Sequence, residues 1–158
     1  MSIERERLIE ALNGDLAREY QAIIAYVVYS QVLKGAAYMS IADELQVHAG
    51  EELQHALKIS KHIDYLGGTP TLAPMPVTPP VDAEQILRAD LENERETIAH
   101  YRQRVRQCEA LGEYAIAEDI REILRDEQEH LIDLATALGI DVPEIPEPDA
   151  APAAARRR

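Results

Sequence analysis

The chain has 158 residues, of which 46% are hydrophobic and 28% are charged, and its formal net charge is −13 at pH 7. This composition is typical of one globular domain with a sizeable core, and it excludes a disordered chain and, without a run of about 18 apolar residues, a membrane-spanning one. The negative charge argues against nucleic acid as a partner, because phosphates repel an acidic surface, and it suits a protein that concentrates cations.

The first predicted helix runs from about residue 3 to residue 33, with apolar side chains on one face at helical spacing. The predicted inward positions are Leu8, Leu12, Leu16, Ile23, Tyr26, Val27 and Ser30. Glu19 lies in phase with them, and a carboxylate in an apolar stripe is costly to bury unless something pairs with it. Glu19 is therefore a candidate ligand, and the alternative is a position at the rim of the stripe. The charged start of this helix has no apolar core of a secretory signal, so we expect a cytoplasmic protein.

The second predicted helix spans about residues 37–66, and its inward stripe carries Glu52 and His55 among isoleucines and leucines. Residues three apart lie on one face of a helix, so this carboxylate and this imidazole can reach the same point. A single such histidine is more often a satisfied core residue, and the repeat described below changes that interpretation. His48 and His62 lie one heptad before and after His55 and could bind passing ions, but neither has a histidine partner at the offset of the repeat described below, so we interpret them as ordinary polar positions.

A proline-rich segment follows Gly67 and Gly68, which end the second predicted helix. About 15 extended residues reach roughly 45 Å, which matches the length of a helix of about 30 residues. The segment can therefore cross from one end of a bundle to the other, so we expect the second and third helices to run parallel. The alternative, a linker between two domains, fails because each half would be a single helix pair.

The third predicted helix covers about residues 83–111 and opens with a capping box at Asp82, and the fourth covers about residues 114–138. Their inward positions are Ile86, Asp90, Glu94, Ile98, Tyr101 and Val105, then Ile116, Ile120, Ile123, Glu127, His130, Leu131 and Leu134. We therefore predict an all-α four-helix bundle over residues 1–140. Residues 141–158 are predicted to form an extended tail rich in proline and alanine.

The two halves of the chain repeat each other at an offset of 75 residues. The pattern D-L-x-x-E-x-x-x-I-x-x-Y occurs twice, and so does I-A followed by E-x-x-H. The offset relates Glu19 to Glu94, Tyr26 to Tyr101, Glu52 to Glu127 and His55 to His130. Four carboxylates and two imidazoles contributed by four helices are the recurring ligand set of a carboxylate-bridged two-metal site.

This ligand set has no thiolate, so it suits iron or manganese rather than a structural zinc site. The predicted ligands are Glu52 and Glu127 as bridges, Glu19 and His55 on one ion, and Glu94 and His130 on the other. Each histidine should donate its second N–H to an acceptor, for which Asp126 and Glu51 are candidates. Tyr26 and Tyr101 either hydrogen-bond ligand carboxylates, supply an electron, or are plain core aromatics.

The six ligands and their spacing, with the segment ILRDEQEH around Glu127, resemble bacterioferritin and its ferritin-like relatives over residues 3–139. The resemblance implies a ferritin-like fold, a di-iron cofactor with Mn or Zn as substitutes, and ferroxidase activity that oxidises Fe(II) to Fe(III). O2 or H2O2 is the implied oxidant, and the product is stored as mineral in a hollow homo-oligomeric shell. The implied partners are thus Fe(II), the oxidant and further copies of the chain.

Departures from the bacterioferritin pattern change some of these expectations. Leu53 stands where bacterioferritins carry the haem-ligating Met, so haem is not expected. A Pro-rich tail replaces their short fifth helix, which leaves a 24-subunit cage, a 12-subunit shell and a dimer open. The paired tyrosines and the clean repeat are also similar to rubrerythrins and miniferritins, although Thr97 stands where rubrerythrins place another Glu. A peroxide-reducing di-iron or di-manganese protein without storage is therefore the alternative function, and a helical shell protein with a relic site is the third.

Overall fold

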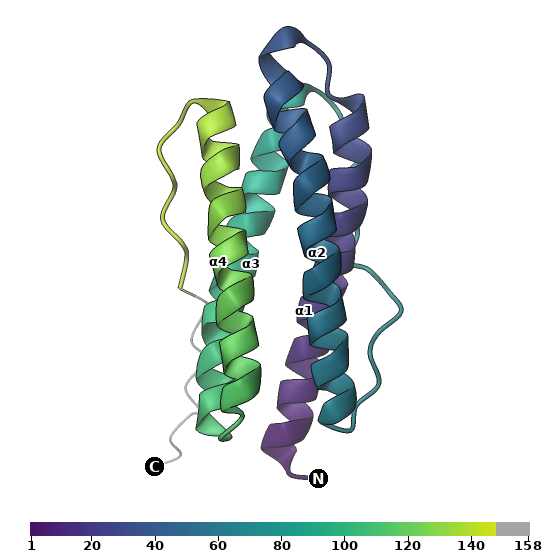
Figure 1. Ribbon diagram of the computed structural model, residues 1–158, viewed down its shortest axis with the longest axis vertical. Coiled ribbons are helices and arrows are strands. Elements are labelled where there is room, and N and C mark those ends of the chain that lie inside the picture. The colour runs from purple at the N-terminus through teal and green to yellow at the C-terminus, as the bar shows by residue number, and fades with distance from the viewer. Residues whose placement is uncertain (148–158) are drawn as a thin grey trace, which may run out of the picture.

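The computed structural model describes residues 1–147, which form a bundle of four long helices (Figure 1). The helices are α1 (Ile3–Val32), α2 (Met39–Tyr65), α3 (Ala83–Ala110) and α4 (Tyr114–Leu138), with a short 3-10 helix, η1 (Ala36–Tyr38), before α2. The described residues contain no strand, so the predicted all-α class is confirmed. The predicted bounds agree with the observed ones except at the start of α2, where η1 takes the place of the first predicted turn.

Local signals in the sequence set the ends of the helices. Ser2 and Asp82 each accept a hydrogen bond from the backbone N–H three residues ahead, at 3.2 and 2.9 Å, and so cap α1 and α3. Gly139 ends α4 at φ 67°, and Gly67 follows α2 at φ 90°. Glycine adopts this left-handed region without the steric penalty that a Cβ imposes, so both helices end where the sequence predicts.

The order of the helices in space depends on the crossover between α2 and α3 (Figure 1). This segment returns along α1 to the opposite end of the bundle, so α2 and α3 run parallel, as predicted from its length. Asn13 of α1 accepts a hydrogen bond from Thr71 N at 2.8 Å and donates one to the Thr69 carbonyl at 3.1 Å. Further along, the Tyr29 hydroxyl donates to the Thr78 carbonyl, so α1 fixes the crossover at both ends.

Two apolar clusters fill the bundle, and a polar centre lies between them. The first cluster includes Leu8, Leu12, Leu16, Ile59, Ile63, Val105, Ile116, Ile120 and Ile123. The second includes Ala25, Tyr29, Ile41, Leu45, Ile86, Leu87, Ile98, Leu131 and Leu134. Apolar side chains thus hold the helices together toward both ends of the bundle, and the ionisable residues lie in the turns between these clusters.

The prediction that Val27 faces the core is wrong. Val27 is 52% exposed, whereas Tyr26 is 2% exposed. Neighbouring residues of an α-helix point about 100° apart, so with Ala25 and Tyr26 buried, Val27 falls on the solvent side of the stripe. The larger Tyr26 takes the buried position.

The segment after α4 returns along the bundle (Figure 1). The Arg95 guanidinium donates to the Glu144 carbonyl at 2.9 and 2.7 Å, and Ile145 packs against the second apolar cluster. The rest of the predicted tail, residues 148–158, lies outside the described residues. Among the helices of residues 1–147, none combines the length and the apolar character needed to cross a membrane.

Candidate metal centre

Six ionisable side chains lie buried in the middle of the bundle, and they are the six predicted ligands. They are Glu19 from α1, Glu52 and His55 from α2, Glu94 from α3, and Glu127 and His130 from α4. Glu94 is 3% exposed and the other five are 1% exposed. Each lies in phase with the apolar stripe of its helix, so the packing that buries the stripe also turns these groups inward.

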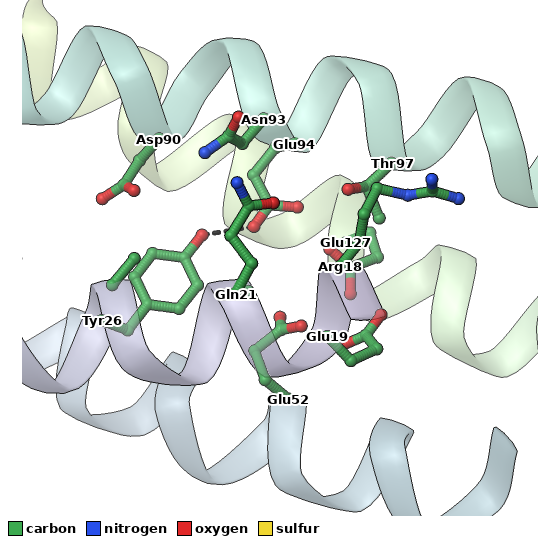
Figure 2. Close-up of a pocket in the computed structure, with 12 residues that line it drawn as sticks. Arg18, Glu19, Gln21, Tyr26, Glu52, Asp90, Asn93, Glu94, Thr97 and Glu127 are labelled. Atoms are coloured by element: carbon green, nitrogen blue, oxygen red, sulfur yellow. Dashed lines mark hydrogen bonds between the residues drawn. The ribbon is translucent and has the colours of Figure 1, made fainter. Parts of the chain in front are cut away.

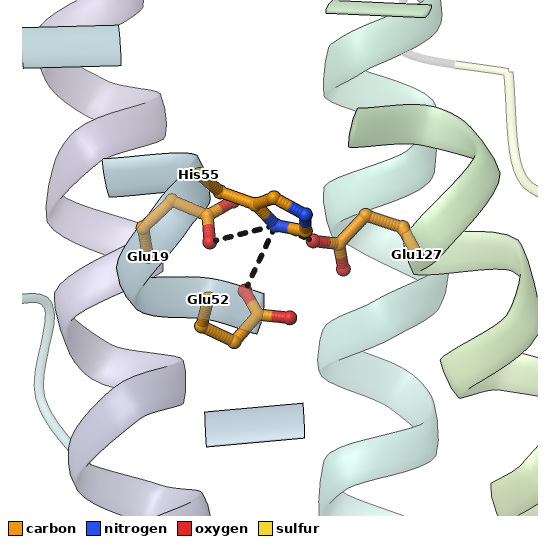
Figure 3. A group of neighbouring side chains, drawn as sticks. All are labelled: Glu19, Glu52, His55 and Glu127. Atoms are coloured by element: carbon orange, nitrogen blue, oxygen red, sulfur yellow. Dashed lines mark ion pairs between the residues drawn. The ribbon is translucent and has the colours of Figure 1, made fainter. Parts of the chain in front are cut away.

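The possible ligand atoms form two groups that share two carboxylates. The groups are Glu19, Glu52, His55 and Glu127, and Glu52, Glu94, Glu127 and His130, with the ligand atoms of each within 4.8 Å of one another. The shared members are Glu52 and Glu127, which are the predicted bridges. His55 lies among Glu19, Glu52 and Glu127 (Figure 3), and its Nδ1 is 2.9 Å from Glu127 Oε1. His130 Nδ1 lies 2.8 Å from Glu52 Oε1. Each imidazole therefore faces a shared carboxylate from the opposite helix.

Each of the six side chains leaves one buried polar atom without a hydrogen-bond partner in the part of the chain that the structure describes. These atoms are Glu19 Oε2, Glu52 Oε1, His55 Nδ1, Glu94 Oε2, Glu127 Oε1 and His130 Nδ1. An unpaired buried polar atom costs about 1–3 kcal/mol, and a charged one costs more. Two divalent cations would satisfy all six atoms at once, because iron and manganese accept carboxylate oxygen and imidazole nitrogen as ligands. The residues present therefore fit a two-metal centre.

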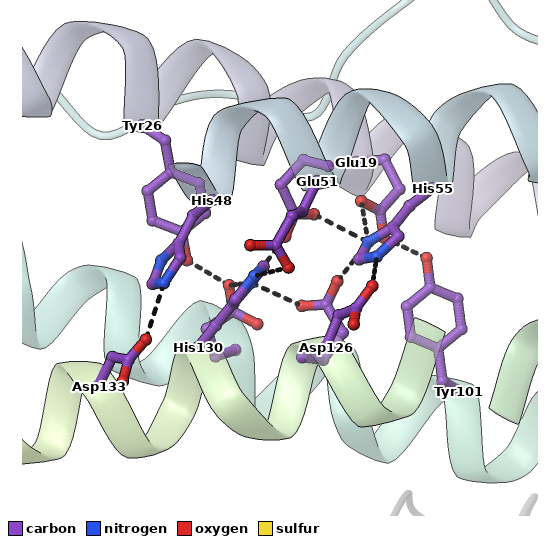
Figure 4. Close-up of polar contacts among 12 residues, drawn as sticks. Glu19, Tyr26, His48, Glu51, His55, Tyr101, Asp126, His130 and Asp133 are labelled. Atoms are coloured by element: carbon purple, nitrogen blue, oxygen red, sulfur yellow. Dashed lines mark hydrogen bonds and ion pairs between the residues drawn. The ribbon is translucent and has the colours of Figure 1, made fainter. Parts of the chain in front are cut away.

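Carboxylates at the outer edge of the centre hold the two imidazoles in position (Figure 4). His55 Nε2 lies 2.8 Å from Asp126 Oδ2, and His130 Nε2 lies 3.4 Å from Glu51 Oε2. These are the acceptors expected from the sequence. Because each Nε2 faces outward to a carboxylate, each Nδ1 faces inward with its lone pair available to a cation.

Two buried tyrosines hold two of the carboxylates. The Tyr101 hydroxyl donates to Glu19 Oε1, and the Tyr26 hydroxyl donates to Glu94 Oε1. Burial raises the pKa of both phenols, and the neighbouring Glu94 raises the pKa of Tyr26 further. Both tyrosines therefore stay protonated and act as donors, so the sequence expectation that they hydrogen-bond predicted ligands is confirmed.

Burial and neighbouring charges shift the pKa values of several groups at the centre in opposite directions. Burial raises the pKa of Glu19 well above its usual value, and the charge of Glu52 raises it further. Burial also acts against the charged form of Glu52, but the close contacts with Glu19 and His130 hold its pKa well below the usual value. Burial opposes charge on His130 as well, yet contacts with Glu52 and Glu94 raise the pKa of its imidazole to about 12. A cation must displace these protons, since a metal binds the unprotonated nitrogen and oxygen.

A narrow pocket between α1 and α3 leads to this centre (Figure 2). Its lining residues include the half-buried Arg18, Gln21, Ala22, Asn93 and Thr97 and the buried Glu19, Glu52, Glu94 and Glu127. Arg18 and small or uncharged polar side chains thus stand between the solvent and the carboxylates.

Sequence reasoning missed His48, which it treated as an ordinary polar position together with His62. The structure buries His48 to 1% exposure and His62 to 7%. His48 Nε2 lies 3.1 Å from Asp133 Oδ2, and the ring stacks on that of His130 at 3.9 Å between centroids. The heptad spacing of three histidines on α2, matched by three aspartates at heptad spacing on α4, could have revealed the pairing.

Comparisons with known proteins agree with this geometry. The sequence profile of the ferritin family, described as a ferritin-like domain, matches residues 9–141. A bacterioferritin from Brucella melitensis is 30% identical over 135 residues, which cover 85% of this chain and 84% of that one. A structure of ferritin-like, diiron-carboxylate proteins from Bacillus anthracis has a TM-score of 0.84 and 33% identity, covering 87% of this chain and 99% of that chain. The Desulfovibrio desulfuricans bacterioferritin, solved to show its diiron site in different catalytic states, has a TM-score of 0.79 and 28% identity, covering 86% of this chain and 80% of that chain. The predicted ferritin-like four-helix fold is confirmed.

Proposed function

Because the chain belongs to the ferritin family through its ferritin-like domain, we propose that its buried centre binds two Fe(II) ions and oxidises them to Fe(III). The proposed ligands are Glu52 and Glu127 as bridges, Glu19 and His55 on one ion, and Glu94 and His130 on the other. The observation that carries the proposal is the set of six buried ligand atoms without a hydrogen-bond partner in residues 1–147, which face one another in two groups with two shared carboxylates. The similarity to diiron-carboxylate proteins supports iron as the metal.

The proposed reaction transfers two electrons for each pair of Fe(II) ions. Two Fe(II) and two protons reduce one O2 to one H2O2, or one H2O2 to two waters. Four carboxylates stabilise the higher charge of Fe(III) more than that of Fe(II), because the attraction scales with the charge of the ion. Removing water from the buried site strengthens this preference.

Tyr26 belongs to the proposed catalytic set. Its hydroxyl donates to Glu94, so it orients one of the proposed ligands, and its buried phenol is in position to supply an electron to the centre. The pocket between α1 and α3 is the proposed path for Fe(II) and the oxidant. Polar groups at Gln21 and Asn93 along this pocket offer oxygen atoms to a cation on its way in.

Stopped-flow absorbance of metal-free protein mixed with Fe(II) and then with O2 or H2O2 tests the proposal. We expect a fast phase that consumes two Fe(II) per chain, and Glu94→Ala should abolish it because one ion loses its terminal carboxylate. Glu92→Ala is the matched control, since Glu92 is exposed on the same helix and, within residues 1–147, pairs only with Arg95 at 2.7 Å. If the unaltered protein shows no fast phase with either oxidant, the proposal is wrong.

The same samples separate iron storage from the alternative function. We propose that oxidised iron is retained as mineral, so repeated additions should leave many more than two iron atoms with each chain after gel filtration. A rubrerythrin-like or miniferritin-like protein would instead react faster with H2O2 than with O2 and retain no more than two. A di-manganese enzyme would be active with Mn(II) and inactive with Fe(II).

We further propose that the chain forms a homo-oligomeric shell. Exposed apolar residues on the outer faces of two adjacent helices support association, because such surfaces are usually covered by a partner. They are Ile24, Val27, Val28 and Val32 on α1, and Val47, Leu53 and Leu57 on α2. Native mass measurement decides among 24 subunits, 12 subunits and a dimer, and a monomer would contradict the shell.

Two further expectations are tested directly. Leu53 is 49% exposed and has no sulfur to bind iron, so the purified protein should show no haem absorbance near 400 nm after expression with added haem precursor. The expected cytoplasmic location is a prediction for fractionation of cells that express the chain.

A further inference from the structure

The surface between α2 and α4 carries a regular set of histidine–aspartate pairs, here called the α2–α4 seam (Figure 4). The pairs are His48 with Asp133, His55 with Asp126, and His62 with Asp119, at Nε2–Oδ2 distances of 3.1, 2.8 and 2.7 Å. The histidines stand seven residues apart on one helix, and the aspartates stand seven apart on the other, which runs antiparallel to it (Figure 1). The three pairs therefore repeat one arrangement at different heights of the bundle.

The residue one turn before each histidine distinguishes the three pairs. Beside His62 this residue is Lys58, whose Nζ lies 2.8 Å from Glu122, so the chain supplies its own cation there. Beside His55 it is Glu51, which faces His130 Nε2 at 3.4 Å. Before His48 the residue is Glu44, which is exposed and makes no ion pair within residues 1–147.

Glu44 completes a group of three possible ligands at the first pair. One carboxylate oxygen of Glu44, one ring nitrogen of His48 and one carboxylate oxygen of Asp133 lie within 4.8 Å of one another. The histidine is buried, whereas the Asp133 side chain is 38% exposed, so the group is rigid on one side and open to water on the other. One imidazole and two carboxylates with open positions suit a divalent transition metal ion.

The hydrogen bonding of His48 also points to a ligand. Its Nε2 faces Asp133 Oδ2, and its Nδ1 is buried without a hydrogen-bond partner within residues 1–147, so Nε2 is the ring nitrogen that a cation beside Asp133 would contact. If a cation replaces the proton between Nε2 and Asp133, that proton can move to Nδ1. Before and after cation binding, one buried ring nitrogen of His48 lacks a hydrogen-bond partner in residues 1–147. Binding therefore costs the ring no additional hydrogen bond.

We propose that Glu44, His48 and Asp133 form a third divalent-cation site on the α2–α4 seam, which takes a single Fe(II), Mn(II), Co(II) or Zn(II). The His48 ring stacks on that of His130 at an interplanar angle of 22°, so the site lies one imidazole away from the dinuclear centre. It is on the side of the bundle opposite the pocket between α1 and α3. A cation bound at this site would lie next to the dinuclear centre, on the face of the bundle away from the pocket between α1 and α3.

Co(II) binding to metal-free protein tests this site without any redox step. Equilibrium dialysis followed by metal analysis should find three Co(II) per chain, and crystals soaked in Co(II) should show a third anomalous peak among Glu44, His48 and Asp133. Glu44→Gln and Asp133→Asn should each reduce the stoichiometry to two, or weaken the third site at least tenfold. Both residues are at least partly exposed, so neither substitution creates a cavity in the apolar core.

Asp119→Asn is the matched control, because it changes the same kind of carboxylate at the pair that has Lys58 in place of Glu44. It should leave three Co(II) per chain. Two peaks at the centre and none on the seam would overturn the third site and leave the proposed function standing. A seam peak without the central pair would do the reverse. Equal loss of cobalt in Asp119→Asn and Asp133→Asn would show nonspecific binding to acidic groups and would also overturn the site.

Discussion

At the scale of single residues, Asp15 and Asp90 occupy equivalent positions of the internal repeat in different surroundings. Asp15 is 1% exposed, and the Arg104 guanidinium donates to its two oxygens at 2.6 and 3.1 Å. Asp90 is 2% exposed, and its Oδ2 has no partner in the described chain. Burial, followed by the nearby carboxylates, raises the pKa of Asp90 well above its usual value. The repeat is broken because Tyr29 stands at the position equivalent to Arg104.

This contrast predicts opposite effects of two substitutions on stability. Arg104→Met should lower the free energy of unfolding by about 1.5–3 kcal/mol, because the buried Asp15 carboxylate loses the two hydrogen bonds from Arg104 and keeps only the one from Arg18. Asp90→Asn should be neutral or stabilising, since it removes a buried ionisable group and breaks no ion pair. Urea denaturation of the metal-free variants measures both values. An Arg104 variant as stable as the Asp90 variant would contradict the argument.

The two tyrosines that donate to ligand carboxylates give a second prediction. Tyr26→Phe and Tyr101→Phe should each weaken cation binding at the centre about 10–100-fold, because partners that orient a ligand contribute that much to metal affinity. Titration calorimetry with Co(II) measures the change.

Tyr29→Phe is the control for these variants. Tyr29 is equally buried, but its hydroxyl donates to the Thr78 carbonyl of the crossover. The Tyr29→Phe variant should be less stable than the unaltered protein and should bind Co(II) with the same affinity. Equal losses of affinity in all three variants would mean that the tyrosines act only through packing.

At the scale of the elements, the ends of the helices depend on a few side-chain caps. Asp82 caps α3, the helix that carries Glu94, and it stands where the crossover enters the bundle. The starts of α2 and α4 have no side-chain cap, so they rely on packing. The start of α3 is therefore a place where one side chain has a separable effect.

Asp82→Ala should lower the free energy of unfolding by about 1 kcal/mol, because the N–H of Gln85 loses its acceptor. Asp82→Asn keeps an acceptor oxygen and should stay close to the unaltered protein. Thermal unfolding followed by circular dichroism compares them. A loss of metal binding in the alanine variant, in addition to the loss of stability, would show that the cap also positions Glu94.

At the scale of the whole molecule, the ionisable centre lies between two apolar clusters, so the middle of the bundle adds little apolar stabilisation of its own. Cations that bind only the folded state should therefore raise the melting temperature. One site at a concentration 100-fold above its dissociation constant contributes about 2.7 kcal/mol.

Calorimetric unfolding with Mn(II) or Co(II), and again after a chelator, checks this prediction. We expect the melting temperature to rise with metal and to return to its first value with the chelator. A metal that binds at the expected stoichiometry and leaves the melting temperature unchanged would indicate equal binding to the unfolded chain.

The sequence by itself determined the four helices, the parallel crossover and the six side chains that meet at the centre. These features follow from the 3.6-residue period, the caps and the 75-residue repeat, which are properties of single helices and of chain length. Glu19 and Glu52 stood out because a carboxylate in an apolar stripe must be turned inward together with the stripe.

Only the tertiary structure decided what happens where helices meet. The pairing of His48 with Asp133, the lone state of Asp90, the outward position of Val27 and the return of residues 140–147 along the bundle all depend on packing between elements. A helical period states which residues share a face, but it does not state which neighbouring helix covers the edge of that face. Burial of the α2–α4 seam, and with it the proposed third cation site, results from the distance and register at which those two helices pack.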